Sequence, residues 1–86
     1  MIKNAFIKYI TNIGFRNSGY YCGREIYAID DWSLSISPDD RSIAFRLYRN
    51  DVHQDSFMVH STEDLDSIFK PVARDIRLKE VLEKNN

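Results

Sequence analysis

Hydrophobic and polar residues alternate strictly along two neighbouring stretches in the middle of the chain, residues 32–37 and 42–49. This period of two predicts two antiparallel strands, each with one face buried and the other in water. Pro38 and the aspartates after it suit a turn between the two strands. The pattern therefore predicts a hairpin whose buried residues are Trp32, Leu34, Ile36, Ile43, Phe45 and Leu47.

Residues 2–13 show a different period, with apolar side chains recurring every three or four positions. This spacing predicts an amphipathic helix. Gly14 is placed to end that helix in the left-handed conformation, and Phe15 can then pack back on Ile10. The apolar stripe consists of Ile2, Ala5, Phe6, Tyr9, Ile10 and Ile13.

The segment between this helix and the hairpin is less regular. Residues 16–19 are expected to form a loop, and residues 20–29 a strand with a bulge or close approach at Gly23. Two arrangements remain open after that strand. A tight turn at Asp30-Asp31 is favoured because aspartate is a poor strand former and a good turn former. One long bent strand over residues 24–37 is the alternative.

The last third of the chain is predicted to return to helix. Residues 50–55 are expected to be a polar connection and residues 56–60 a short last strand. Residues 61–64 can cap a following helix, and Pro71 indicates either a second helix or a kinked continuation up to residue 84. Its buried side chains are expected to be Leu65, Ile68, Phe69, Val72, Ala73, Ile76 and Leu82.

The predicted fold class is α+β, in a single domain spanning residues 1–86. An N-terminal helix precedes an antiparallel three- or four-stranded meander, and two C-terminal helices pack on one face of the sheet. With 86 residues, 43% of them hydrophobic, the chain can form one modest core. The lone Cys22 excludes an internal disulfide, and no apolar run is long enough to cross a membrane. We expect a cytoplasmic protein.

The sequence contains no pattern typical of catalysis or of a cofactor site, and we expect neither. His53 and His60 are interpreted as surface residues, and Cys22 as a packing residue within a strand. Four aspartates would gather at one end of a four-stranded meander, where they could bind a hard cation or a basic protein surface. Solvated turns are the favoured interpretation of these residues, which are Asp30, Asp31, Asp51 and Asp55.

The exposed side of the hairpin is the candidate site. Arg46 and Tyr48 project from one strand beside a row of serines on the other, and arginine and tyrosine are enriched at protein interfaces. Tyr20, Tyr21 or both are expected to join them. The competing interpretation is that Arg46 only covers apolar surface with its stem. The predicted partner-binding residues are Arg24, Ser33, Ser35, Arg46, Tyr48 and Arg49.

Another protein is the predicted partner. Nucleic acid is disfavoured because the net charge is −1 and residues 61–64 place acidic side chains where a helix would meet phosphate. A stripe formed by Arg24, Arg46 and Arg49 would favour it. A homodimer through an exposed edge strand stays open.

The stretch Ser61–Phe69 resembles strand-to-helix junctions in small phage-encoded proteins, among them anti-CRISPR inhibitors. It covers about a tenth of the chain and consists of a capped amphipathic helix, with no functional residue specific to that group. The resemblance implies a non-enzymatic inhibitor that binds a bacterial defence complex without a cofactor.

Overall fold

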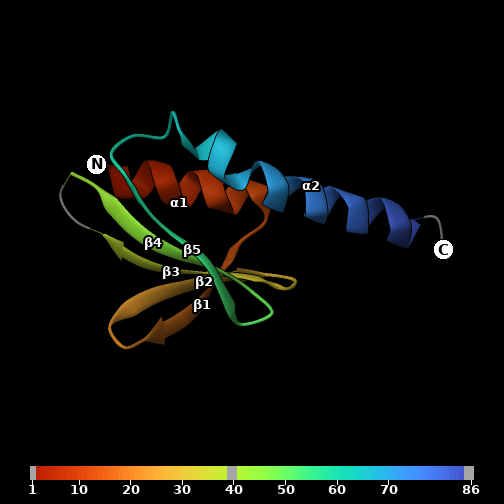
Figure 1. The fold of residues 1–86 in the computed structure, drawn as a ribbon, viewed down its shortest axis with the longest axis horizontal. Helices are drawn as coiled ribbons and strands as arrows, with labels where there is room; N and C mark the ends of the chain where they lie inside the picture. Colours follow the sequence, from red (N-terminus) through yellow and green to blue (C-terminus); the bar gives the residue numbers. More distant parts are fainter. Residues whose placement is uncertain (1, 39–40, 85–86) are drawn as a thin grey trace.

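The computed structural model describes residues 2–38 and 41–84, and it has one sheet between two helices in the chain order. The sheet is a meander in which each strand is antiparallel to the next, and both helices lie against the same face of it (Figure 1). The α+β class and the antiparallel meander are confirmed. The elements are α1 (Ile2–Ile13), β1 (Arg16–Tyr21), β2 (Arg24–Ile29), β3 (Trp32–Pro38), β4 (Ile43–Arg49), β5 (Val52–Val59) and α2 (Leu65–Lys84).

The hairpin predicted in the middle of the chain is β3 and β4. The two strands pair over their whole length, with Leu34 opposite Leu47 and Ile36 opposite Phe45. All six side chains predicted to face inward are at most 6% exposed. The period of two therefore identified both strands and the face that each one buries.

Helix α1 has the predicted bounds and the predicted end. Phe6 and Ile10 are fully buried, whereas Ala5, at the margin of the apolar stripe, is exposed. Gly14 has a φ of 128°, and the N–H groups of Gly14 and Phe15 donate to the carbonyl oxygens of Thr11 and Ile10 at 3.1 and 3.0 Å. This is the Schellman arrangement, and it turns the buried Phe15 back under the helix.

The sheet has five strands, so the prediction of three or four was wrong. Residues 16–19, expected as a loop, belong to β1, and the expected strand over 20–29 is divided by a two-residue turn at Cys22 and Gly23. Both turn residues have positive φ, 53° and 77°, as a tight hairpin requires. Cys22 is consequently exposed in a turn and does not pack within a strand.

Two of the other three turns are equally short, and the turn expected at Pro38 and the aspartates after it includes residues 39–40, which lie outside the described residues. Asp30 and Asp31 connect β2 to β3, so the favoured turn is confirmed and the single bent strand is excluded. Asn50 and Asp51, both with positive φ, connect β4 to β5. The last strand therefore begins at Val52, and the expected polar connection over 50–55 was too long.

One continuous helix, α2, follows the sheet, which corrects the prediction of two C-terminal helices. Pro71 lies inside it, on the exposed side of the helix. A proline there removes one backbone hydrogen bond, and the carbonyl it leaves unpaired on an exposed surface can bond to water. Burial of Val72 and Ile76 beyond the proline supports the continuation, whereas Leu82, expected in the core, is 60% exposed.

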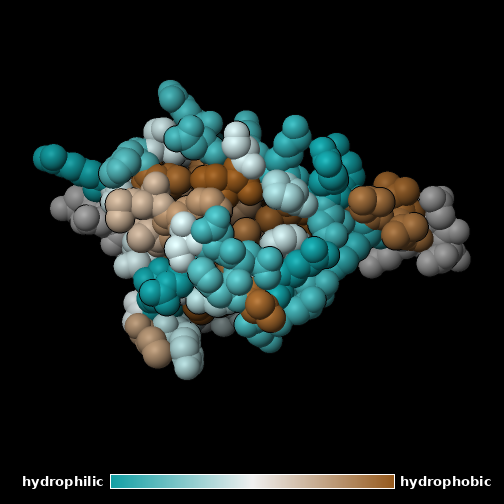
Figure 2. Space-filling view, viewed as in Figure 1, coloured by the Kyte–Doolittle hydropathy of each residue, from teal (hydrophilic) through white to brown (hydrophobic). Residues whose placement is uncertain are grey.

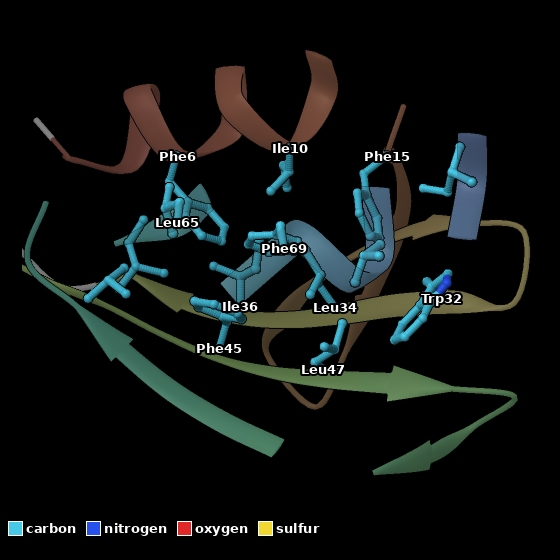
Figure 3. Close-up of a cluster of buried hydrophobic side chains, with 14 residues drawn as sticks. Phe6, Ile10, Phe15, Trp32, Leu34, Ile36, Phe45, Leu47, Leu65 and Phe69 are labelled. Carbon is cyan, nitrogen blue, oxygen red and sulfur yellow. The ribbon is translucent and has the colours of Figure 1, made fainter. Parts of the chain in front are cut away.

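The core lies between the helices and the covered face of the sheet (Figure 3). The ring of Phe69 is at its centre, with the rings of Phe6, Tyr9, Phe15 and Phe45 at centroid distances of 5.7 to 6.3 Å. Beyond the core, α2 projects past the end of α1 (Figure 1). The projecting turns carry a hydrophobic patch, visible at the C-terminal end in Figure 2, that is formed by Leu78, Val81 and Leu82.

Tyr9 joins the two helices through a hydrogen bond from its hydroxyl to α2. Its hydroxyl donates to Asp66 Oδ1 at 2.5 Å. Burial, together with this hydrogen bond and the charge of Asp66, raises the pKa of Tyr9 from 10.0 to about 12. The folded chain thus holds the phenol proton more tightly than the unfolded chain does.

We expect this contribution of Tyr9 to stability to be complete below the unfolded pKa and to disappear as the pH rises through the folded value. Urea unfolding at several pH values from about 9 to about 12 should show the wild type losing stability faster than Tyr9→Phe, which has no phenol to ionise. A difference between the two proteins that does not change with pH would contradict this assignment.

Candidate functional site

The helices leave one face of the sheet uncovered (Figure 1). Successive side chains of a strand point to opposite faces, so the neighbours of the buried positions lie on the uncovered side. There Ser33 lies opposite Tyr48, and Ser35 lies opposite Arg46. Arg24, at the start of β2, reaches over from the next strand to Ser35. We call this uncovered side of β1–β5 the open face.

Arg24 is held in place on the open face by Ser35. Its Nε donates to Ser35 Oγ at 2.5 Å, and its Nη2 donates to the carbonyl oxygen of Ser35 at 3.0 Å. The arginine covers the serine, which is only 8% exposed. Ser35 therefore positions Arg24 and offers little surface of its own. A guanidinium that is already ordered loses less side-chain entropy when it binds a partner.

Five of the six predicted site residues surround one shallow hollow of about 440 Å³ on the open face. These are Arg24, Ser33, Ser35, Arg46 and Tyr48. The hollow has a mixed character, because aromatic, apolar and polar groups of four strands, β1 to β4, and of two turns meet in it. Its other lining residues are Tyr21, Cys22, Ile26, Leu34 and Asp51.

Arg46 is the central cation of the open face. It lines the main hollow and also two smaller ones beside it, of about 370 and 430 Å³. Its side chain is exposed and makes no hydrogen bond or ion pair with the described residues. Its neighbours Tyr48 and His53 meet edge to face at 5.6 Å, and His53 Nε2 shares a hydrogen bond of 2.9 Å with Ser56 Oγ.

The charges of the strands are divided between the two faces. Glu25 lies opposite Ile36 and Asp55 lies opposite Leu47, so both carboxylates have the register of the covered face. Arg24 and Arg46 have the register of the open face. Along β1–β5, no carboxylate shares the open face with the two arginines. The one acidic residue that lines the hollow, Asp51, lies in the turn between β4 and β5. The open face is thus a positive surface on a chain of net charge −1.

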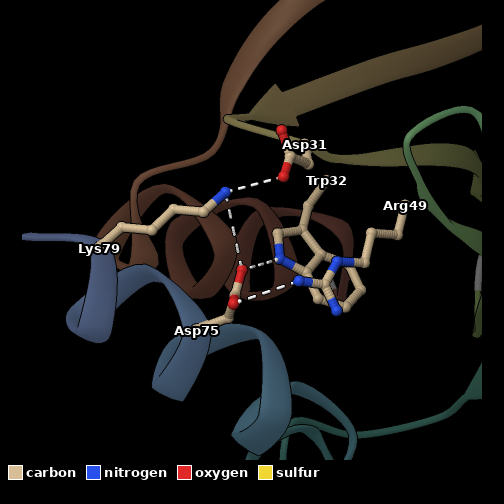
Figure 4. A network of polar contacts seen from close by, with 5 residues as sticks. All are labelled: Asp31, Trp32, Arg49, Asp75 and Lys79. Atoms are coloured by element: carbon tan, nitrogen blue, oxygen red, sulfur yellow. Dashed lines mark hydrogen bonds and ion pairs between the residues drawn. The ribbon is translucent and has the colours of Figure 1, made fainter.

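Arg49, the sixth predicted residue, lies elsewhere and has a different role (Figure 4). Its guanidinium carbon is 5.0 Å from the ring centroid of Trp32, and its Nη2 is 3.3 Å from Asp75 Oδ1. Asp75 Oδ2 also accepts a hydrogen bond of 3.0 Å from Trp32 Nε1. Arg49 therefore joins α2 to the sheet. The stripe of Arg24, Arg46 and Arg49 that would favour nucleic acid is not formed.

A second ion pair strengthens this junction. Lys79 Nζ lies 2.8 Å from Asp31 Oδ2 and 3.9 Å from Asp75 Oδ2. The hydrogen bond from Lys79 lowers the pKa of Asp31 below 3.8 and in turn raises the pKa of Lys79. We call the five residues the Asp75 clasp; they are Asp31, Trp32, Arg49, Asp75 and Lys79.

Sequence reasoning anticipated the tyrosine of the hollow only in part. Tyr21 joins the site, whereas Tyr20, paired with Glu25, has the register of the covered face. Cys22 and His53 were not predicted as site neighbours, because the turn at residues 22–23 and the early start of β5 were both missed. Gly23 was the available signal, since glycine readily adopts the positive φ that a two-residue hairpin turn requires.

The turns that carry Asp30, Asp31 and Asp51 lie at the same end of the sheet, where Asn50 N–H donates to Asp31 O at 2.8 Å, whereas Asp55, also expected in a turn, lies within β5. In the described ranges, however, no three side chains of histidine, cysteine, aspartate or glutamate lie close enough together to hold a metal ion. Asp31 is engaged by Lys79. Within those same ranges, neither helix has the length and apolar character that crossing a membrane requires.

Comparison of the chain with protein-family models, with curated proteins and with solved structures gave no match.

Proposed function

We propose that this protein is a non-enzymatic binding module whose open face binds an acidic segment of another protein. The observation that carries the proposal is the position of Arg46, which is exposed and unpaired among the described residues at the centre of an uncovered sheet face. The ordered Arg24 lies beside it. An uncovered face that carries two arginines and no carboxylate along its strands is complementary to a negatively charged surface.

The lining residues suit contact with a protein. A guanidinium can bind a carboxylate through two parallel hydrogen bonds, and the hydroxyl groups of Ser33 and Tyr48 can donate to the same partner. Tyr21 and Tyr48 offer large, stiff aromatic surfaces on either side of the arginines. The hollow is shallow and shared among several strands, which fits a protuberance on a folded partner.

Two further observations separate a protein from a nucleic acid as the partner. Arg49 is engaged by Asp75, so the phosphate-binding stripe has only two members. Asp51 lies at the rim of the hollow, where it would repel a phosphate backbone running across the face, whereas a protein can place its carboxylates singly against the two arginines. The resemblance of Ser61–Phe69 to small phage-encoded inhibitors makes a bacterial defence complex the first partner to test.

The test is a double substitution on the open face, Arg46→Glu with Tyr48→Ala. The protein captured from host extract by the wild type would be identified, purified and titrated against each variant. We expect the double variant to fold normally, because Arg46 makes no polar contact within the described chain, and to bind at least about tenfold more weakly. Lys8→Glu, an equal charge reversal on the exposed side of α1, is the matched control and should bind like the wild type.

Two results would overturn the proposal. The first is full binding by the Arg46→Glu, Tyr48→Ala variant. The second is capture that disappears when the extract is treated with nuclease, since that outcome would make nucleic acid the ligand of the open face. A charge swap would establish the contact directly. An acidic residue of the purified partner is changed to lysine, and this partner variant should recover binding to the Arg46→Glu variant.

A further inference from the structure

The helix layer contains a second surface, a groove between α1 and α2. The two helices lie side by side and run in the same direction (Figure 1). Tyr9 meets Asp66 and Phe69 near the start of α2, and Ile13, at the end of α1, lies beside Ala73 and Arg77 further along. The groove lies on the helix side of the molecule, away from the open face, and its argument is independent of the function proposed above.

The floor of this groove is apolar. Two hollows, of about 510 and 340 Å³, share Ile13, Ala73 and Arg77 and therefore lie next to each other along the groove. The first is floored by Tyr9, Phe69 and Ala73. Phe69 is almost wholly buried, and the other floor residues are half-buried, so the groove exposes their apolar edges to whatever occupies it.

The α2 side of the groove is a row of cations. Lys70, Arg74 and Arg77 recur at intervals of four and three, which places them on one side of the helix over about 10 Å of its length. All three are exposed, and none is in a hydrogen bond or ion pair with the described residues. Like charges at these spacings repel one another and destabilise an isolated helix. The three cations therefore repel one another, and no described carboxylate forms an ion pair with them.

The nearby carboxylates are used elsewhere or stand at the ends of the row. Asp66 is held by the Tyr9 hydroxyl, and Asp75 faces the sheet in the Asp75 clasp. Glu80 lines the end of the groove beyond Arg77. An anionic occupant would therefore meet, in the middle of the groove, three cations that have no partner among the described residues, and a carboxylate at each end.

We propose that this groove seats an acidic amphipathic helix of a partner protein. The apolar stripe of such a helix would lie on Tyr9, Ile13 and Ala73. Carboxylates spaced three and four residues apart along its flank would meet Lys70, Arg74 and Arg77, which have the same spacing. A nucleic acid fits less well, because the apolar floor has no group that could bind its phosphates, whereas the apolar stripe of a helix can pack on that floor.

The probe is a synthetic peptide of about 18 residues, long enough to form a helix, with a leucine stripe and glutamates at i, i+4 and i+7 beside it. Two control peptides carry lysine for each glutamate, or the same composition in an order that destroys the stripe. Binding is measured by fluorescence anisotropy and located by nuclear magnetic resonance of the labelled protein. We expect the glutamate peptide alone to bind and to shift the signals of Tyr9, Ile13 and Ala73.

The protein variant Lys70→Glu, Arg74→Glu, Arg77→Glu is expected to bind the glutamate peptide at least about tenfold more weakly. If that variant fails to fold, Lys70→Gln, Arg74→Gln, Arg77→Gln removes the charge without reversing it and should show the same direction of change. The Arg46→Glu, Tyr48→Ala variant of the open face should bind like the wild type.

Several outcomes would overturn this proposal without touching the function proposed for the open face. They are equal binding of the reordered peptide, binding unchanged in the glutamine variant, and signal shifts confined to the open face. Tighter binding of a short duplex DNA or RNA than of the peptide, abolished by the same three substitutions, would assign the row to nucleic acid instead.

Discussion

Replacement of Phe69 by alanine is expected to lower the free energy of unfolding by about 3–5 kcal/mol, the range for removing a buried phenylalanine ring. Phe69 is 1% exposed and lies against four other aromatic rings that come from α1, from the segment after it and from β4. Its loss would leave a cavity at the point where both helices and the sheet meet. Small domains have a total stability of about 5–15 kcal/mol, so a large part of the population would unfold at moderate temperature.

Urea denaturation followed by far-ultraviolet circular dichroism measures this effect. Leu78→Ala is the control, because it removes a large apolar side chain from the same helix at a position that is 54% exposed. We expect the control to change stability by no more than about 0.5 kcal/mol. Equal stabilities of the two variants would show that Phe69 is not the centre of the core.

Trp32→Ala is expected to have the second largest effect, a loss of about 3 kcal/mol or more. The indole is 6% exposed, its N–H donates to Asp75, and Arg49 lies over its ring. Its removal opens the end of the core below α2 and also dismantles the Asp75 clasp. Trp32→Phe separates the two contributions, because it keeps one aromatic ring in the core and loses the N–H donor together with the second ring of the indole. That variant should cost about 1.5–3 kcal/mol, the usual net value of a hydrogen bond to a charged group.

The same urea titration compares these variants with Arg49→Ala, whose side chain is 43% exposed and whose ion pair should contribute little at the surface. If Trp32→Ala is as stable as Trp32→Phe, packing at this position is unimportant. In that case the buried face of β3 would have been assigned wrongly.

Regular periods made parts of the fold predictable. In β3 and β4 every second residue is apolar, and in α1 the apolar residues recur at helical spacing, so local pattern and tertiary burial agree. The strand β1 offers no such pattern. It is an edge strand whose side chains are mostly exposed, and its place is set by backbone pairing with β2. Edge strands of this kind carry no hydrophobic alternation for sequence reasoning to detect.

The helix α2 shows a limit of another kind. Pro71 predicted a break, because proline in a helix interior usually costs about 3 kcal/mol. Here the apolar residues on both sides of it, Phe69 and Val72, are buried in the same core. Tertiary packing outweighs the local penalty, and packing of that kind is not encoded in the immediate sequence around the proline.

Alternation along β4 also explains what was right and wrong about the site. Arg46 and Tyr48 share one parity and lie together on the open face, as predicted. Arg49 has the opposite parity, so the same rule that placed Tyr48 outward should have placed Arg49 on the covered side. The anchoring of Arg24 by Ser35 depends on the register between β2 and β3, which composition does not reveal.

The position of α2 after the strands has a consequence for synthesis on the ribosome. Every strand pairs with its neighbour in the chain, so the hairpins can form one after another as they emerge. Until α2 follows, α1 alone shields their apolar side. At about 5–20 residues per second, the 20 residues of α2 take roughly 1–4 s to make. During that interval the nascent sheet presents a hydrophobic surface to chaperones, and the packing of α2 on the sheet then covers it.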